Sequence, residues 1–295
     1  MQLILTGTLL FLLTTCQTTP KAEEIWRLGW RLNMDVYGED FSSASDRFDS
    51  LLTLSPEPEL AFLINGLRAK VQTGESEEAQ TIFREMPEDL QNQACPNLDT
   101  AIFTLCRNLP HTTVTRPKMQ RDLIKMFVAD QAVRGNVLTR LIEKYSLDST
   151  AIPSLDKPAT QVDLENQEAL KALIDEYGFP TAEQVGREAM QGVFFIIQHA
   201  DANPNSQAAQ LPQIEAAVKR GDLDGQRYAY LYDRIQRNKG EPQRYGTQFS
   251  KADPISGTFE LAKVEDPDNL DRRRRKVGLM PMDTYKEFMR KSLNR

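Results

Sequence analysis

The chain has 295 residues, of which 40% are hydrophobic and 26% are charged. This is enough apolar material for one large or two ordinary domains, so wholesale disorder and a disulfide-dense miniprotein are excluded. Acidic residues outnumber basic ones by 42 to 36, and the net charge of −6 disfavours general binding to nucleic acid. Two histidines and three cysteines leave little room for a zinc site. We therefore predict no nucleic-acid partner, no cofactor and no bound metal.

The first twenty residues carry no charged side chain and have an apolar centre at residues 9–13. This centre is shorter than the roughly 20 apolar residues that span a membrane, and it is typical of a secretory signal. The sequence Leu13-Thr14-Thr15-Cys16 resembles the bacterial lipobox, in which the cysteine carries the lipid. We predict that residues 1–16 are an export signal and that Cys16 anchors the chain to a membrane of the cell envelope. Another cleaved signal, an uncleaved anchor and a fortuitous apolar start remain alternatives.

Two further cysteines, Cys95 and Cys106, form an even pair if Cys16 is lipidated. An oxidising envelope compartment would permit a disulfide bond between them. Cys106 follows an apolar run, so a buried free thiol is the alternative.

Residues 22–115 are predicted to be a region of short helices, because apolar residues recur at helical spacing over 24–34, 41–52, 60–71 and 75–86. Asp40 is expected to cap the second helix, and Gly74 to end the third. The last two helices resemble a tetratricopeptide-type helical hairpin. The residues that carry this likeness are Leu63, Gly66, Ala69, Gly74, Glu78, Ala79 and Phe83. A solenoid needs three or more such units, and only one hairpin is recognisable in this sequence. Residues 22–107 are therefore interpreted either as a surface that binds a protein partner or as a helical spacer.

Residues 117–295 are predicted to be a compact helical domain with one short extended segment, which makes the whole fold mainly α. Helices are expected over 117–142, 164–177, 181–199, 206–220 and 224–238, and a hairpin or extended segment over 255–264. Thr181 and Gln184 are spaced as a capping box. Asp266 and Pro267 are expected to open a last helix.

That last helix contains the basic run Arg272 to Lys276. Acidic residues at its start and basic residues at its end suit the helix macrodipole, so we interpret the run as a structural face. A phosphate or nucleic-acid patch is the alternative.

His199 is the first candidate functional residue. It continues the apolar stripe of the preceding helix, three residues after Ile196, so its imidazole should point inward and need hydrogen-bond partners. A second polar region follows Gly240, and Gly246 within it could supply the positive φ of a tight loop. The polar residues of this loop are Gln243, Arg244, Tyr245, Thr247 and Gln248.

Several motifs lie across the second domain. They are Asp130-Gln131-Ala132-Val133-Arg134, Gly178-Phe179-Pro180, Val185-Gly186, Gln198-His199-Ala200-Asp201, Asp233-Arg234, Gln243-Arg244-Tyr245-Gly246-Thr247-Gln248, Asp271-Arg272-Arg273 and Val277-Gly278-Leu279. In order and spacing they resemble domain-of-unknown-function family 6624, over about residues 117–290. The resemblance implies a mostly helical bacterial domain that often follows a signal segment, and it brings no established activity.

Three functions remain open at this point. The first is an envelope binding or interaction module, whose polar cluster holds a small polar ligand or a peptide. Its ligand-binding residues would be Gln198, Asp201, Arg234, Gln243, Arg244, Tyr245, Thr247 and Gln248. The second is a hydrolase-like enzyme in which His199 is the general acid/base, oriented by Asp233 or Asp201. The third is a structural component with His199 as a satisfied core residue. A metal held by His199, Asp201 and Asp233 is a weaker alternative.

Overall fold

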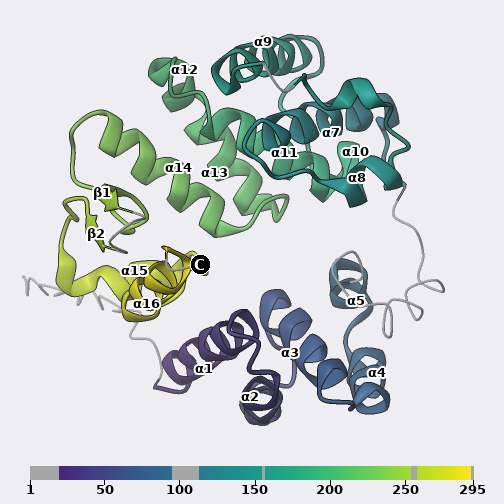
Figure 1. The fold of residues 1–295 in the computed structure, drawn as a ribbon, viewed down its shortest axis with the longest axis vertical. Coiled ribbons are helices and arrows are strands. Elements are labelled where there is room, and N and C mark those ends of the chain that lie inside the picture. Colours follow the sequence, from purple (N-terminus) through teal and green to yellow (C-terminus); the bar gives the residue numbers. More distant parts are fainter. Residues whose placement is uncertain (1–19, 95–112, 155–156, 254–257, 294–295) are drawn as a thin grey trace, which may run out of the picture. The chain divides into compact units, whose positions relative to one another are not determined.

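The computed structural model describes residues 20–94, 113–154, 157–253 and 258–293 (Figure 1). The chain divides into two compact units, Met1–Arg107 and Asn108–Arg295. The predicted signal segment, the lipidation site at Cys16, and the Cys95 and Cys106 pair lie outside the described residues. Within the described ranges, no helix combines the length and the apolar character needed to cross a membrane.

The first unit consists of short helices, as its apolar spacing predicts. They are α1 (Pro20–Tyr37), α2 (Phe41–Leu54), α3 (Leu60–Gln72), α4 (Ser76–Glu85) and α5 (Glu88–Ala94). The predicted cap of α2 is confirmed, because the Asp40 carboxylate accepts a hydrogen bond from the Ser43 backbone N–H at 3.1 Å. Phe48, Leu63 and Phe83 are fully or almost fully buried between these helices.

A buried lysine is the most unusual feature of this unit. The Lys70 side chain has no solvent exposure, and its Nζ lies 2.9 Å from Asp49, 2.8 Å from Glu75 and 3.3 Å from Glu78. Burial by itself lowers the pKa of Lys70, but the surrounding carboxylates outweigh burial and raise its pKa above the ordinary value. The cation therefore joins α2 and α3 to the start of α4.

The second unit is also mainly helical, with one small sheet. Its helices are α7 (Pro117–Ala132), α8 (Thr139–Lys144), α9 (Ala159–Tyr177), α10 (Ala182–Val185), α11 (Arg187–Gln198), α12 (Pro204–Ala209), α13 (Leu211–Arg220), α14 (Gly225–Asn238), α15 (Leu270–Lys276) and α16 (Met282–Leu293), with 3-10 turns η3 (Ser149–Ala151) and η4 (Pro267–Asn269). Strands β1 (Phe249–Asp253) and β2 (Thr258–Leu261) pair antiparallel. The extended segment predicted over 255–264 is thus part of a hairpin that begins earlier in the chain.

Two of the predicted helices are interrupted. The single helix predicted over 117–142 is wrong, because Gly135 adopts a φ of +80° and the chain turns between α7 and α8. The Asn136 backbone N–H donates to the Gln131 carbonyl at 3.0 Å, which closes the end of α7 as glycine-terminated helices commonly do. The helix predicted over 181–199 also breaks, between α10 and α11, although the Thr181–Gln184 capping box that starts it is confirmed.

The last helix opens at Asp266 and Pro267 as predicted, but without a side-chain cap. Asp266 has a φ of +40° and makes no side-chain cap. Its carboxylate instead accepts hydrogen bonds from the Asn269 side chain at 3.2 and 3.0 Å, and from Arg273 at 3.3 Å. The helix therefore begins as the η4 turn before α15.

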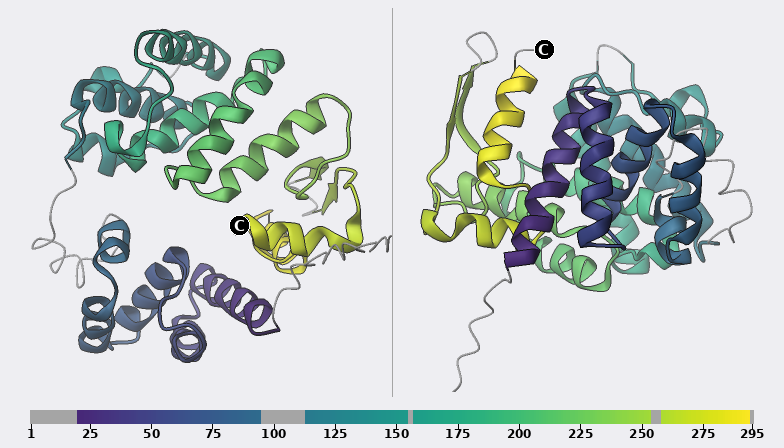
Figure 2. Two further views of the ribbon diagram at one scale, coloured as in Figure 1. Left: turned by 180° about the vertical axis from the view of Figure 1, so that it is seen from behind. Right: turned by 90° about the horizontal axis from the view of Figure 1, so that it is seen from below.

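Helices α7 and α11 lie side by side, and α9 packs on both (Figure 1). Their close approach depends on Gly192, where an added Cβ would lie 2.8 Å from the Cβ of Phe127. Helices α13 and α14 come next, and the hairpin with α15 and α16 lies on the other side of α14 (Figure 2). The main core includes Leu123, Phe194 and Leu231. It therefore fixes the positions of the ends of α7 and α11 relative to each other.

Candidate functional site

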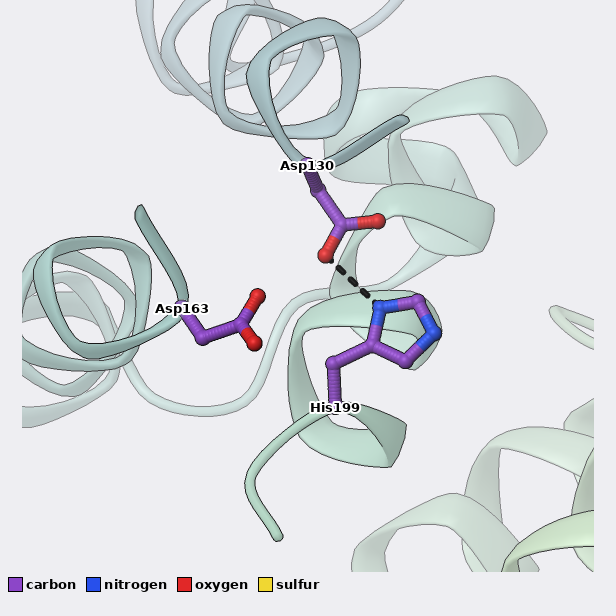
Figure 3. Close-up of side chains that lie close together, drawn as sticks. All are labelled: Asp130, Asp163 and His199. Carbon is purple, nitrogen blue, oxygen red and sulfur yellow. Dashed lines mark hydrogen bonds and ion pairs between the residues drawn. The ribbon is translucent and has the colours of Figure 1, made fainter. Parts of the chain in front are cut away.

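The imidazole of His199 pairs with a carboxylate that the sequence analysis did not assign to it. His199 follows the last residue of α11, and its Nδ1 lies 2.7 Å from Oδ1 of Asp130, in the last turn of α7 (Figure 3). Asp130 is 1% exposed and the His199 side chain is 15% exposed. The prediction that Asp233 or Asp201 orients His199 is therefore corrected, because both of those carboxylates are bound by other groups.

The polar residues of the Asp130–Arg134 motif converge on the same carboxylate. Gln131 donates from Nε2 to Oδ2 of Asp130 at 2.8 Å. Arg134, one turn further on, donates from Nη1 to the Asp130 carbonyl at 2.8 Å and to its Oδ1 at 3.2 Å. Each carboxylate oxygen of Asp130 thus has a donor, which satisfies a buried charge and holds it in one orientation.

A second carboxylate, Asp163, approaches from α9. Arg134 donates from Nη2 to both of its oxygens, at 2.7 and 2.8 Å, in a two-pronged ion pair. The Asp163 side chain is 14% exposed and that of Arg134 27%. Asp130, Arg134, Asp163 and His199, here called the His199 cluster, therefore join three helices with two carboxylates, one guanidinium and one imidazole.

The geometry leaves one imidazole nitrogen available. An ionised carboxylate only accepts hydrogen bonds, so Nδ1 of His199 carries the proton that it shares with Asp130. The second ring nitrogen, Nε2, points away from both carboxylates (Figure 3). Phe195 lies beside the imidazole, with 5.8 Å between the ring centroids. In this tautomer Nε2 has a free lone pair and can accept a proton.

The same residues also meet the distance requirement for a metal site. Asp130, Asp163 and His199 can each offer one ligand atom, and the three atoms lie within 4.8 Å of one another. However, the guanidinium of Arg134 already contacts both carboxylates. A metal ion would have to replace that cation, and Nδ1 would have to lose its proton. The donor set therefore fits a hydrogen-bonded acid–base pair better than a metal centre.

Asp201 and Arg234 form a separate ion pair beside the end of α11. Nε of Arg234 donates to Oδ1 of Asp201 at 2.8 Å, and Nη2 contacts Oδ2. Burial alone raises the pKa of Asp201, but the hydrogen bonds from Arg234 and Asn238 outweigh burial and lower the pKa below its usual range. Gln207 donates a hydrogen bond from Nε2 to the Gln198 carbonyl at 2.9 Å. These contacts hold α14 and α12 on α11.

Asp233 organises the loop over 243–248. Its side chain is fully buried and accepts hydrogen bonds from the backbone N–H groups of Arg244, Tyr245 and Thr247, at 2.8, 3.0 and 3.0 Å, and from the Thr247 hydroxyl at 2.9 Å. Burial raises the pKa of Asp233, while the four donors act in the opposite direction. The positive φ predicted for Gly246 is confirmed at +67°. Asp233 is therefore a loop-shaping residue, not the partner of His199.

The other polar residues of this loop bind one another or residues later in the chain, which include Ala262, Glu265 and Arg274. Gln243 donates from Nε2 to the carbonyls of Gln248 and Ala262, at 2.9 and 2.8 Å, and its Oε1 accepts from the Gln248 backbone N–H at 2.8 Å. Arg274 is 1% exposed and donates to the Tyr245 carbonyl at 2.6 Å. Among the described residues, no hydrogen bond joins this loop to His199. The structure thus separates what the sequence suggested was one polar cluster into two.

The model of family DUF6624, a family of unknown function, matches residues 117–293. The chain belongs to this family. No curated protein and no solved structure matches the chain. Both polar clusters lie within the DUF6624 region, as the motifs predicted.

Sequence reasoning found His199 in the DUF6624 domain but missed Asp130 and Asp163 as its neighbours. One signal was available for Asp130. It lies three residues after Phe127 and seven after Leu123, so it is a charged residue on the buried stripe of α7. Nothing comparable marks Asp163, which lies in a helix with many charged residues.

Proposed function

We propose that the DUF6624 domain of this chain is a hydrolase-type enzyme in which His199 is the general base. The observation that carries the proposal is the 2.7 Å contact between Nδ1 of His199 and Asp130, while Nε2 has no hydrogen-bond partner among the residues that the structure describes. A histidine held at one nitrogen by a buried carboxylate is the arrangement that enzymes use to fix the tautomer and to stabilise the imidazolium formed during turnover.

The proposed reaction adds water across an acyl bond. Nε2 of His199 takes a proton from a water molecule while the water oxygen forms a bond to the acyl carbon. The electron pair of the C=O π bond moves onto the carbonyl oxygen, and it re-forms the double bond when the leaving group departs. The resulting imidazolium is paired with the Asp130 carboxylate. As the bond between that carbon and the leaving group breaks, Nε2 returns the proton to the leaving group, and His199 is neutral again.

The surroundings of the pair support this role. Asp130 is held by Gln131 and Arg134, so its carboxylate keeps its position when the histidine gains and loses a proton. The His199 side chain is 15% exposed, which leaves it within reach of water. A fully enclosed imidazole would instead favour a purely structural role.

The tautomer is the first thing to measure. The chain has two histidines, His111 and His199, so long-range ¹H–¹⁵N spectra of ¹⁵N-histidine-labelled protein contain two imidazole patterns, and His111→Gln assigns them. We expect His199 to carry its proton on Nδ1 and to have an unprotonated Nε2 at neutral pH. In Asp130→Asn this preference should be lost. A proton on Nε2 throughout the neutral range would exclude the general-base role.

The activity test uses the same variants. Wild-type protein is screened against carboxylic esters, thioesters and amides, each with and without Zn²⁺ or Mn²⁺. For any substrate that is hydrolysed, His199→Gln should lower kcat/KM by about 10²- to 10⁴-fold, the usual contribution of general acid–base catalysis, and His111→Gln should not change it. Equal rates in wild type and His199→Gln would contradict the proposal. Activity that depends on added metal would favour the metal-site alternative.

We also propose that the chain is exported and anchored to a membrane through Cys16. The support is the apolar, uncharged start of the chain and its lipobox-like end. Expression in a bacterium with radiolabelled palmitate should label the wild-type chain and leave Cys16→Ser unlabelled. Equal labelling of the two, or no labelling of either, would contradict the anchor.

A further inference from the structure

A small basic cavity lies away from the His199 cluster, on the other side of α14. Its volume is about 260 Å³. Its lining comes from the 243–248 loop, from the segment before η4, and from α15. The lining residues are Arg244, Tyr245, Glu265, Asp266, Arg272, Arg273, Lys276 and Val277. Four cations and two carboxylates thus face a cavity in a chain whose net charge is −6.

One of the four cations is held rigidly. Arg273 donates from Nε to the Arg244 carbonyl at 2.8 Å, and from Nη2 to the carbonyls of Glu265 and Asp266 at 2.5 and 2.9 Å. Its side chain is 12% exposed. These bonds are to main-chain oxygens, so they fix the position of the Arg273 guanidinium in the cavity lining without neutralising its charge. The contact with the Asp266 carboxylate offsets part of that charge.

Two other cations have no acidic partner. Arg272 and Lys276 lie four residues apart on α15, so their side chains are neighbours on one face of that helix. Both residues are exposed, and neither belongs to an ion pair among the described residues. Like charges at this spacing repel each other, which disfavours the arrangement unless an anion lies between them.

The acidic residues of the wall are already engaged. Asp266 binds Asn269 and Arg273, while Glu265 lies 3.5 Å from Nε of Arg244. Tyr245 adds no negative charge near neutral pH, because burial raises the pKa of its phenol to about 12. The electrostatic field in the cavity is therefore positive and is set by side chains that a ligand can reach.

We propose that this cavity binds a phosphate group, as part of a small phosphomonoester or of a phosphate-bearing lipid headgroup. Guanidinium groups bind phosphate through paired hydrogen bonds, and a lysine adds a point charge. The volume lies below the roughly 300–1,000 Å³ of ordinary ligand pockets, so it suits one headgroup and not a large cofactor. The basic run interpreted from the sequence as a structural face thus has two parts. Arg274 is structural, while Arg272 and Lys276 recognise the ligand.

The experiment measures binding of three probes to the full chain at constant ionic strength. The probes are inorganic phosphate, glycerol 3-phosphate, and phosphatidylcholine vesicles with or without phosphatidic acid. The test variant is Arg272→Gln with Lys276→Gln. The control is Lys171→Gln with Lys219→Gln, which removes the same charge from two exposed helix positions far from the cavity lining.

We expect saturable binding of a phosphate probe by wild type and control, and binding at least about tenfold weaker in the test variant, since each charge-assisted hydrogen bond contributes about a factor of ten or more. Binding of soluble glycerol 3-phosphate identifies a small-molecule site. Binding only of vesicles that contain phosphatidic acid identifies a lipid headgroup. No saturable binding of any probe, or equal weakening in test and control variants, would overturn the proposal. Neither result depends on the activity of His199.

Discussion

Nδ1 of His199 lies 2.7 Å from Oδ1 of Asp130, although 69 residues separate the two in sequence. The contact forms because α7 and α11 pack along one another with Gly192 at their closest approach. The Asp130 carboxylate is thus contacted by three side chains, those of a histidine, an arginine and a glutamine. A change at Asp130 should therefore affect both the stability of the domain and the state of His199.

Asp130→Asn is expected to lower the free energy of unfolding by about 3 kcal/mol, because it removes the buried anion that His199, Gln131 and Arg134 contact, while Arg134 keeps its ion pair with Asp163. For a domain of this size, that corresponds to a fall in Tm of roughly 6–12 °C. Scanning calorimetry of the full chain measures it, with Asp175→Asn as a control at an exposed helix position. Equal Tm values for the two variants would show that the Asp130 charge does not support the fold.

Asp233→Asn should destabilise the same domain for a different reason. The carboxylate accepts four hydrogen bonds, and an amide would turn its NH₂ group toward N–H donors. We expect a loss of about 3 kcal/mol, since buried donors left without acceptors are costly. Urea unfolding measures the loss, and Asp268→Asn, at an exposed position in η4, is the control. If Asp233→Asn were as stable as the control, the loop would not depend on this carboxylate.

The ion pair between Asp201 and Arg234 predicts a pH dependence. The pKa of Asp201 is lower in the folded protein than its ordinary value of 3.8, so the unfolded chain binds a proton more readily. The pair therefore stabilises the fold above about pH 4, and its contribution is lost as the pH falls through the folded-state pKa. Urea midpoints of wild type and Asp201→Asn should differ at pH 7 and converge near pH 2. A constant difference over this range would contradict the assignment.

Lys70→Met should lower the local stability of helices α2–α4 in the first unit. The substitution leaves the carboxylates of Asp49, Glu75 and Glu78 close together without their buried cation. We expect a local loss of about 1 kcal/mol, because the three carboxylates that repel one another are partly solvent-exposed. Hydrogen exchange followed by mass spectrometry should show faster exchange in α2–α4 and unchanged exchange in α7 and α11. Lys219→Met, at a residue whose side chain is 72% exposed, is the control and should leave both regions unchanged.

Sequence patterns were sufficient to predict the helical character of both units, the caps at Asp40 and Thr181, and the positive φ of Gly246. Each of these depends on a short segment, either through apolar periodicity or through hydrogen bonds between residues a few positions apart. The family motifs also depend only on local order and spacing, and the family that they indicated is confirmed over residues 117–293. Helix lengths were less predictable. The break at Gly135 requires a left-handed residue, and the apolar pattern continues across it.

The carboxylate that pairs with His199 could not be predicted from the sequence, because it depends on the packing of helices that are far apart in the chain. Sequence spacing places Asp130 on the buried stripe of its helix, but it does not show which other helix meets that stripe. The choice depends on which helices pack together. Helix α7 brings Asp130 to the end of α11, whereas α14 directs Asp233 toward the backbone amides of the 243–248 loop. Packing of the core determines these pairings, because the free energy gained by burying apolar surface exceeds that of any single polar contact. Each buried polar group then forms hydrogen bonds with the groups that this packing places beside it.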